Sequence, residues 1–382
     1  MASVYENAFI TIAATSARSG KDGFLTERPV RSSRIHGFRS DSGNDVYVRE
    51  KLQHGLFAFA ASATTDFSST PLLKRGWCYQ ERILSTRVLH FTNCEIVWEC
   101  KRTTNCECGE IEDMAMGKCT YSLRLANYQP RQDMDGETFD ILKGLWRETV
   151  NAYSRMGLTN SSDVFPALSG IASKFQSLQL GKYAAGMWER DLQAGLSWKT
   201  VKRMGNVRRG ASLGEYRAPT WSWASVIGPT QSSRGTGLTA SPIQLLELEC
   251  TPKGENVLGE ICYGYIRVSG LVLPVTLYTA GPGRPDVKLV VKRARGKNWE
   301  FKFDFDVDME DHELKALNKQ TMFCLQLFYD DSVETEGLVL RRDQKYVENG
   351  KIDGGTYERL GVFSKVPLAL FDGVQQTEIV LI

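Results

Sequence analysis

The hydrophobic positions of the first half of the chain repeat with a helical period. Apolar residues recur three and four positions apart over residues 4–13, which predicts an amphipathic helix at the start of the chain. The same spacing over residues 142–153 predicts a second helix. Two more helices are expected, one capped by Ser162 or Asp163 and one over residues 183–196.

A further helix and a hairpin are predicted between these segments. Thr70-Pro71 is typical of a helix start, because a capping hydroxyl precedes a proline at the first helical position. That helix should run through residues 75–84. Residues 87–91 and 95–98 are strand-like and are joined by Thr92-Asn93, which is the spacing of a β-hairpin.

From about residue 240 the hydrophobic period changes to two. Leu246, Leu248 and Cys250 alternate with glutamates, and similar strand-like runs follow at residues 263–268, 271–278, 287–291, 301–307, 322–329, 338–341, 358–363 and 378–382. Many short strands at this spacing predict an antiparallel sandwich or a barrel-like region. We therefore expect an α+β protein with two domains, a mostly helical region over residues 1–235 and an antiparallel β region over residues 236–382.

Length and charge narrow the function classes. The 382 residues fit two domains, and 47 Lys+Arg against 45 Asp+Glu give a net charge of +2, which argues against a dedicated nucleic-acid binder. The longest apolar stretch, residues 266–279, is interrupted and is shorter than the ~20 residues of a membrane span. No positive charge precedes the apolar residues 8–14, so a secretion signal is not expected. These features predict a soluble, cytoplasmic protein.

The nine cysteines are expected to be reduced in that compartment. Five of them follow one another in a short stretch and could supply four thiolates to zinc; they are Cys94, Cys100, Cys106, Cys108 and Cys119. They contain no Cys-x-x-Cys pair, so ordinary reduced cysteines are favoured, no metal site is assigned, and zinc remains an alternative.

Two other patterns receive structural interpretations. Asp304, Asp306 and Asp308 have calcium-like spacing but lack the glycine and the glutamate of a calcium loop, and they are expected on the solvated face of a strand. His90 alternates with apolar residues in a strand, so a surface or hydrogen-bonded histidine is favoured over a catalytic base.

The stretch from Arg75 to Arg82 is the most unusual in the chain. On a helix Trp77 and Glu81 share a face, so Glu81 should be at least partly buried. Two interpretations stay open, an ion-pair hub, which is favoured, and a catalytic carboxylate with a shifted pKa. A partner for the carboxylate is expected, either several backbone donors or an arginine, with three candidates: Arg75, Arg87 and Arg155.

Lys74-Arg-Gly-Trp-Cys-Tyr-Gln-Glu-Arg-Ile-Leu-Ser-Thr-Arg-Val-Leu-His-Phe91, followed by Val97-Trp-Glu-Cys100, resembles the heterokaryon-incompatibility (HET) domain proteins of filamentous fungi. Further blocks agree in the same order, from Val4-Tyr-Glu-Asn-Ala8 to Ala218-Pro-Thr-Trp-Ser-Trp-Ala-Ser225, so the resemblance covers residues 4 to about 225. Two blocks that precede these in the family are not found. The chain is therefore expected to be a short form or to begin at an internal methionine.

The resemblance implies non-self recognition and programmed cell death. Under it, the protein is an interaction and signalling module whose partners are other proteins, with self-association left open, rather than nucleic acid or membrane. The alternative is enzymatic, because HET domains have been likened to TIR domains, some of which cleave NAD. Glu81 would then be catalytic, with Arg75 and Gln80 positioning it or the substrate. A recruited metabolic enzyme with a Trp-lined pocket is the third possibility, and no cofactor is assigned.

Overall fold

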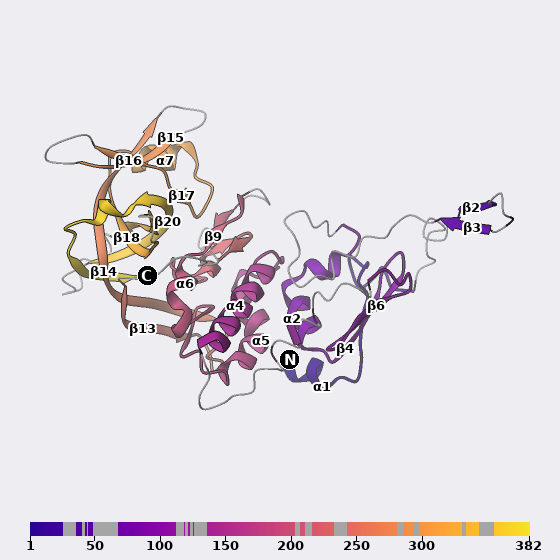
Figure 1. Cartoon of the computed structure of the whole chain (residues 1–382). Helices are drawn as coiled ribbons and strands as arrows, with labels where there is room; N and C mark the ends of the chain where they lie inside the picture. The colour runs from indigo at the N-terminus through magenta and orange to yellow at the C-terminus, as the bar shows by residue number, and fades with distance from the viewer. Residues whose placement is uncertain are drawn as a thin grey trace. The chain divides into compact units, whose positions relative to one another are not determined.

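A computed structural model describes residues 1–25, 36–39, 43, 45–48, 68–111, 118, 121–122, 125, 136–202, 207–210, 216–232, 243–280, 286–292, 298–330, 334–343 and 355–382. The chain forms two compact units, described here separately. The first unit consists of Met1–Asn160 and Ala167–Gln179, and the second of Ser161–Pro166 and Leu180–Ile382. Helices and many strands are both present (Figure 1), so the α+β class is confirmed. The domain boundary expected at residue 235 stays a prediction.

A four-stranded sheet forms the frame of the first unit. Its strands follow the order β1-β4-β5-β6, with bounds Thr11–Ala13, Arg87–Phe91, Ile96–Cys100 and Thr104–Cys106. β1 pairs with β4 in parallel, whereas the other neighbours are antiparallel. The predicted hairpin is thus confirmed. Its loop has four residues, closed by the Thr92 hydroxyl, which accepts the backbone N–H groups of Cys94 and Glu95.

The opening helix is shorter than its apolar pattern predicts. Helix α1 spans Ala2–Asn7, and the chain then enters β1 instead of continuing in a helix to Ala13. Thr11 and Ile12 are β-branched, which suits a strand, and Ile12 lies opposite Leu89 of β4. Pairing with β4 therefore determines the structure here rather than local periodicity.

The other helices of the first unit follow the sequence more closely. The segment after Thr70 divides into a 3₁₀ turn η3 (Pro71–Lys74) and helix α2 (Gly76–Leu84), because Arg75 is extended. The predicted second helix is α4 (Gly136–Tyr153). The third is also divided, into η4 (Ser161–Val164), which belongs to the second unit, and α5 (Pro166–Gln176). A separate two-stranded hairpin comprises β2 (His36–Arg39) and β3 (Asp45–Val48).

Helices α4 and α5 contribute most of the core of this unit. Their buried faces include Leu142 and Trp146 from α4 and Leu168, Ile171 and Phe175 from α5. The rings of Trp146 and Phe175 meet edge to face with centroids 5.1 Å apart. The 3.6-residue spacing of these apolar positions accounts for both helices.

A nine-stranded, mostly antiparallel sheet dominates the second unit. Strand β14 (Ile261–Ala280) is its longest and pairs with four others. The order is β16-β15-β14-β18-β19-β20-β17, with β13 beside β14 and β21 beside β14 and β20. The remaining bounds are β13 Gln244–Pro252, β15 Asp286–Val291, β16 Trp299–Phe301, β17 Asp304–Phe305, β18 Thr321–Tyr329, β19 Glu334–Arg342, β20 Thr356–Pro367 and β21 Gln376–Leu381.

Short elements surround this sheet. They include α7 (Asp311–Leu317), η8 (Trp223–Ser225), η10 (Leu368–Phe371), the pair β9 (Lys199–Thr200) with β12 (Thr230–Gln231), and the pair β10 (Arg208–Arg209) with β11 (Val226–Ile227). One apolar cluster fills the space between α7, η10 and the sheet. It includes Leu277, Met322, Cys324 and Phe363, all essentially inaccessible to solvent.

The helix expected over residues 183–196 does not form as one element. The structure has β7 (Tyr183–Ala184), β8 (Met187–Trp188), η5 (Glu189–Asp191) and a short helix α6 (Leu192–Leu196). Ala185 and Gly186 form the turn between the two strands with positive φ values of 44° and 84°. A Cβ at Gly186 would lie 2.5 Å from Trp223 Nε1, so only glycine fits there.

The prediction for the three aspartates is wrong at Asp306. Asp304 and Asp308 are exposed, but Asp306 is buried and forms a bidentate ion pair with Arg359. The two distances are 2.9 Å from Nε to Oδ2 and 3.0 Å from Nη2 to Oδ1. The Arg359 guanidinium also donates to Leu196 O and lies 3.6 Å from the centre of the Trp198 ring. Burial lowers the pKa of Arg359, and the Asp306 carboxylate opposes that shift. Arg359 thus joins β20 to the residue after β17 and, through Leu196 and Trp198, to the end of α6 and the segment after it.

Candidate functional site

The Arg75–Arg82 motif lies on α2, which begins at a tight backbone approach. Gly76 N donates to Gly157 O at 2.8 Å, and Gly157 N donates to Lys74 O at 2.6 Å. A Cβ at Gly76 would lie 2.5 Å from Leu158 Cδ2. The motif glycine therefore allows the start of α2 to pack against the loop after α4.

Gln80 lies on the side of α2 that faces α5. Its side chain is buried, and its Oε1 accepts the backbone N–H of Gly170 at 2.5 Å. Gly170 has no room for a side chain, because a Cβ there would lie 2.8 Å from Gln80 Oε1 and 2.6 Å from the Ala2 Cβ. Gln80 thus holds α5 against α2 and faces away from solvent.

Glu81 is half-buried beside α1, near Tyr5 and Cys78. Burial and the Glu81 carboxylate raise the pKa of both the Tyr5 hydroxyl and the Cys78 thiol to about 12. Arg75 is exposed, and its charge partly opposes the shift at Cys78. The structure therefore brings Glu81 and Arg75 to the surroundings of Cys78, whereas Gln80 points elsewhere.

The arginine partner expected for Glu81 is not found. In the ranges that the structure describes, no arginine forms an ion pair with Glu81 and no backbone N–H donates to it. Arg87 instead donates to Phe9 O at 3.2 Å, and its guanidinium lies 4.7 Å from the centre of the Phe9 ring. The expected ion pair between Glu81 and Arg75, Arg87 or Arg155 is therefore not present among the described residues.

A fully buried carboxylate of this unit is Glu99, on β5. Arg82, next to Glu81 on α2, donates two hydrogen bonds to the Glu99 carboxylate, from Nε to Oε2 at 2.7 Å and from Nη2 to Oε1 at 2.6 Å. The Glu99 side chain is fully buried, and that of Arg82 is 12% exposed. Burial alone would raise the pKa of Glu99, but Arg82 and His90 hold it well below its usual range. Glu99 thus has the role that the sequence suggested for Glu81.

His90 extends the same hydrogen-bonded chain to the segment after β1. Its Nε2 lies 2.9 Å from Glu99 Oε2, and its Nδ1 lies 2.9 Å from the hydroxyl of Thr15. Burial lowers the pKa of His90, which favours the neutral ring. Nε2 then carries the proton toward the carboxylate, and Thr15 donates to Nδ1. Sequence reasoning favoured a hydrogen-bonded or surface histidine, and the first of these is confirmed.

A third basic group, Lys118, lies near this carboxylate. Its side chain is buried, and burial lowers its pKa to about 8 although Glu99 favours the charged form. Its Nζ has no hydrogen-bond acceptor within the described residues. Arg82, Glu99, His90 and Lys118 therefore form a cluster of mostly buried titratable groups.

The Thr15 hydroxyl, the His90 imidazole and the Glu99 carboxylate are arranged in the order of a nucleophile–base–acid relay. However, Thr15, His90 and Glu99 are all essentially inaccessible to solvent, so no substrate reaches the hydroxyl in this conformation. The arrangement instead joins α2, the hairpin and the end of β1. Arg82 and Glu99 both belong to the stretch that carries the family resemblance. The sequence signal for the buried Glu99 was its period-two spacing from Val97, which places both residues on the buried face of β5.

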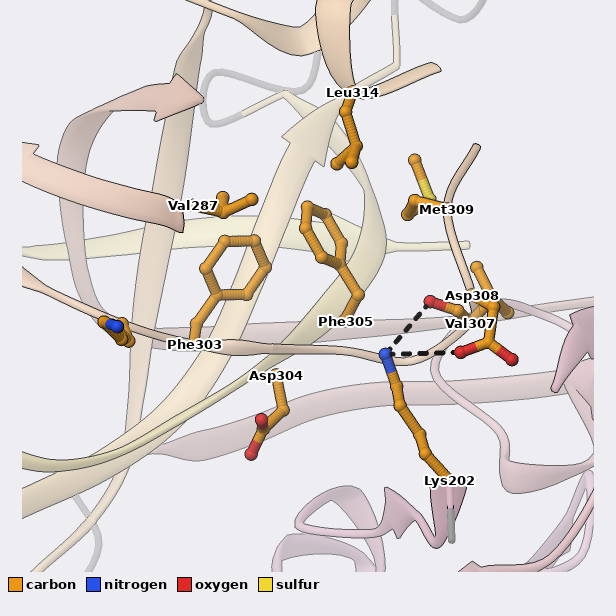
Figure 2. A pocket seen from close by; sticks show the side chains of 10 residues that line it. Lys202, Val287, Phe303, Asp304, Phe305, Val307, Asp308, Met309 and Leu314 are labelled. Atoms are coloured by element: carbon orange, nitrogen blue, oxygen red, sulfur yellow. Dashed lines mark hydrogen bonds and ion pairs between the residues drawn. The ribbon is translucent and has the colours of Figure 1, made fainter. Parts of the chain in front are cut away.

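A hollow of about 410 Å³ lies in the second unit (Figure 2). Phe303 and Phe305 form its apolar wall, together with Val287, Met309 and Leu314. Lys202 closes one side, with Nζ 3.4 Å from Val307 O and 3.7 Å from Asp308 Oδ1. Its lining contains no tryptophan. The described tryptophans before residue 225 in this unit, Trp188, Trp198, Trp221 and Trp223, are buried, so this hollow is not the Trp-lined pocket considered from sequence.

One protein-family model matches the N-terminal part of the chain. Residues 1–81 match the family model described as Heterokaryon incompatibility protein (HET). This match confirms the HET resemblance. No curated protein and no solved structure matches the chain. Among the described residues, no helix has the length and apolar character needed to cross a bilayer.

The HET match locates part of the candidate site. It contains α1, β1, η3 and α2 up to Glu81, and with them Arg75, Gln80 and Thr15. Arg82, His90 and Glu99 follow the matched residues. The catalytic roles suggested for Glu81, Gln80 and Arg75 stay predictions.

Proposed function

We propose that this HET protein acts in fungal heterokaryon incompatibility as an interaction and signalling module that triggers programmed cell death. The family match supports a heterokaryon-incompatibility-type protein. The observation that carries the finer proposal is an apolar surface on the four-stranded sheet of the first unit.

This surface, here called the outer sheet face, is formed by side chains that alternate with the buried ones. Leu89 and Phe91 on β4 and Ile96 and Trp98 on β5 are half-buried, whereas Val88, His90, Val97 and Glu99 point inward. Cross-strand register places Ile12, Leu89 and Trp98 in one row, with Phe91 opposite Ile96. The outer sheet face thus consists of Ile12, Leu89, Phe91, Ile96 and Trp98.

Exposed aromatic residues extend the outer sheet face. Phe9 is 78% exposed beside Arg87, and Ile12 is 57% exposed. Phe24 packs edge to face on Phe91, with ring centroids 4.9 Å apart. Arg87 lies on the same side of β4 as Leu89 and Phe91. An exposed apolar surface bordered by polar side chains is typical of a protein-binding site. We therefore propose that its partner is another polypeptide with a complementary apolar surface, which includes a second copy of this chain.

Inducible expression in a filamentous fungus tests the death response. We expect hyphal extension to slow and a membrane-impermeant dye to enter the cells after induction. Expression of the same chain with the outer sheet face disrupted is the matched control. Normal growth at full expression of the unaltered chain would contradict the proposal.

One observation favours NAD cleavage as a second candidate. Glu81 is half-buried beside Tyr5 and Cys78 and has no arginine ion pair among the described residues, and a carboxylate in this setting would stabilise the cationic sugar that develops as nicotinamide leaves. Purified protein would release nicotinamide from NAD, Glu81→Gln would abolish the release, and the exposed-site variant Glu110→Gln would retain it. Absence of release by the unaltered protein would remove this candidate.

A further inference from the structure

Three potential metal ligands converge at one end of the hairpin in the first unit. Glu95 immediately precedes β5, Cys106 ends β6, and Cys108 lies in the turn after it. The register that pairs Val97 with Cys106 brings these segments together. The turn is closed by Gly109, whose N–H donates to Cys106 O and whose φ of 77° suits glycine.

The donor atoms of these residues are close enough to share one ion. The sulfur atoms of Cys106 and Cys108 are 3.2 Å apart and are not bonded to each other, and all three ligand atoms lie within 4.8 Å of one another. Glu95 is 5% exposed, and its carboxylate accepts the backbone N–H of Cys108 at 3.1 Å. Leu73, Val97 and Ile111 form an apolar cluster against Cys106. Apolar side chains therefore cover one side of the site.

Two thiolates and one carboxylate suit zinc better than a hard cation. Zinc binds cysteine sulfur at about 2.3 Å and carboxylate oxygen at about 2.0–2.2 Å, whereas calcium and magnesium prefer oxygen alone. Tetrahedral zinc would place the two sulfurs about 3.7 Å apart. A small opening of the turn that carries Cys108 reaches this separation.

We propose that Glu95, Cys106 and Cys108 bind a zinc ion, with water in the fourth position. The ligand set differs from the five-cysteine alternative considered from sequence. Cys100 lies at the other end of β5, about 13 Å along the strand from its start, and accepts the N–H groups of Arg102 and Thr103. Cys94 directs its thiol to Asn93, and Cys119 lies outside the described residues.

Metal analysis of the full chain tests the site. The protein would be produced with zinc in the medium, kept reduced, dialysed and measured by mass spectrometry of its metal content. We expect one zinc ion per chain in the unaltered protein and in the control variants Cys100→Ser and Cys262→Ser. Cys106→Ser and Cys108→Ser should lower the zinc content to background, and Glu95→Gln should weaken zinc binding by at least about tenfold.

A second measurement keeps the test independent of variant folding. Zinc added to the metal-free, unaltered chain should protect Cys106 and Cys108 from alkylation and leave Cys262 reactive, as read from peptide masses. Two results would overturn the proposal. One is an unaltered chain with no more zinc than Cys106→Ser, and the other is a Cys106–Cys108 disulfide that forms while zinc gives no protection.

Discussion

At the scale of residues, two neighbours on α2 have different surroundings in the structure, which the sequence could not reveal. Arg82 enters a buried ion pair with Glu99, whereas the adjacent Glu81 stays half-buried near Tyr5 and Cys78. Sequence predicted a buried carboxylate with an arginine partner in this region but assigned it to Glu81. Arg82 and Glu99 are 17 positions apart, so helical spacing alone could not reveal their pairing.

The two glutamates should therefore differ in their effect on stability. Glu99→Gln removes the charge that compensates the buried Arg82, and we expect it to lower the free energy of unfolding by about 3–5 kcal/mol. Glu81→Gln breaks no ion pair and should cost less than about 1 kcal/mol. Urea denaturation of both variants measures the difference. Equal costs would contradict the assignment of Glu99 as the buried charge.

His90 and Glu99 also make the first unit sensitive to acid. The pKa of each is lowered in the folded chain, so the unfolded state binds protons first as the pH falls, and folding loses stability. For His90 the loss begins below pH ~6.5 at up to about 1.4 kcal/mol per pH unit, and for Glu99 it begins below pH ~4.3. Amide hydrogen exchange in β4 and β5 measures this loss of stability as the pH falls. His90→Gln should flatten the dependence between pH 7 and 5, and an unchanged slope would contradict this account.

At the scale of elements, periodicity predicted α4, the hairpin and the long strands of the second unit. It failed where a long-range contact determines the backbone. Residues 11–13 form a strand because β4 pairs with them. Residues 183–188 form a two-stranded hairpin, because the turn at Ala185 and Gly186 packs against Trp223. Periodicity placed Arg75, Gln80 and Glu81 on one helix. It could not show that Gln80 faces α5 and that Glu81 faces α1.

The contact between α2 and α5 depends on a glycine. A Cβ at Gly170 would lie within 3.0 Å of Ala2, Gln80 and Leu84, so Gly170→Ala should separate the helices and lower the free energy of unfolding by about 1–3 kcal/mol. Gly144→Ala on α4 is the matched control, because a Cβ there meets nothing within 4 Å. It should raise the stability by about 0.5–1 kcal/mol. Thermal unfolding of the two variants in parallel would show opposite shifts, and two shifts of the same sign would contradict this packing.

At the scale of the whole molecule, the family match and the apolar surface lie in the same unit. Most of the exposed large hydrophobic side chains that the structure describes are in the first 25 residues, within the HET match. The second unit contributes a large sheet with a filled core. We therefore propose that the first unit, which contains the HET match, presents the partner-binding face.

The most direct test alters that face without disturbing the fold. Ile12→Lys places a charge on an exposed position of β1 and should change the free energy of unfolding by no more than about 0.5 kcal/mol, as at other surface sites. Val257→Lys, at a 59% exposed position in the second unit, is the matched control. On induced expression in a filamentous fungus, the account predicts growth arrest by the unaltered chain and by Val257→Lys, and normal growth with Ile12→Lys. Arrest by Ile12→Lys at equal protein level would contradict it.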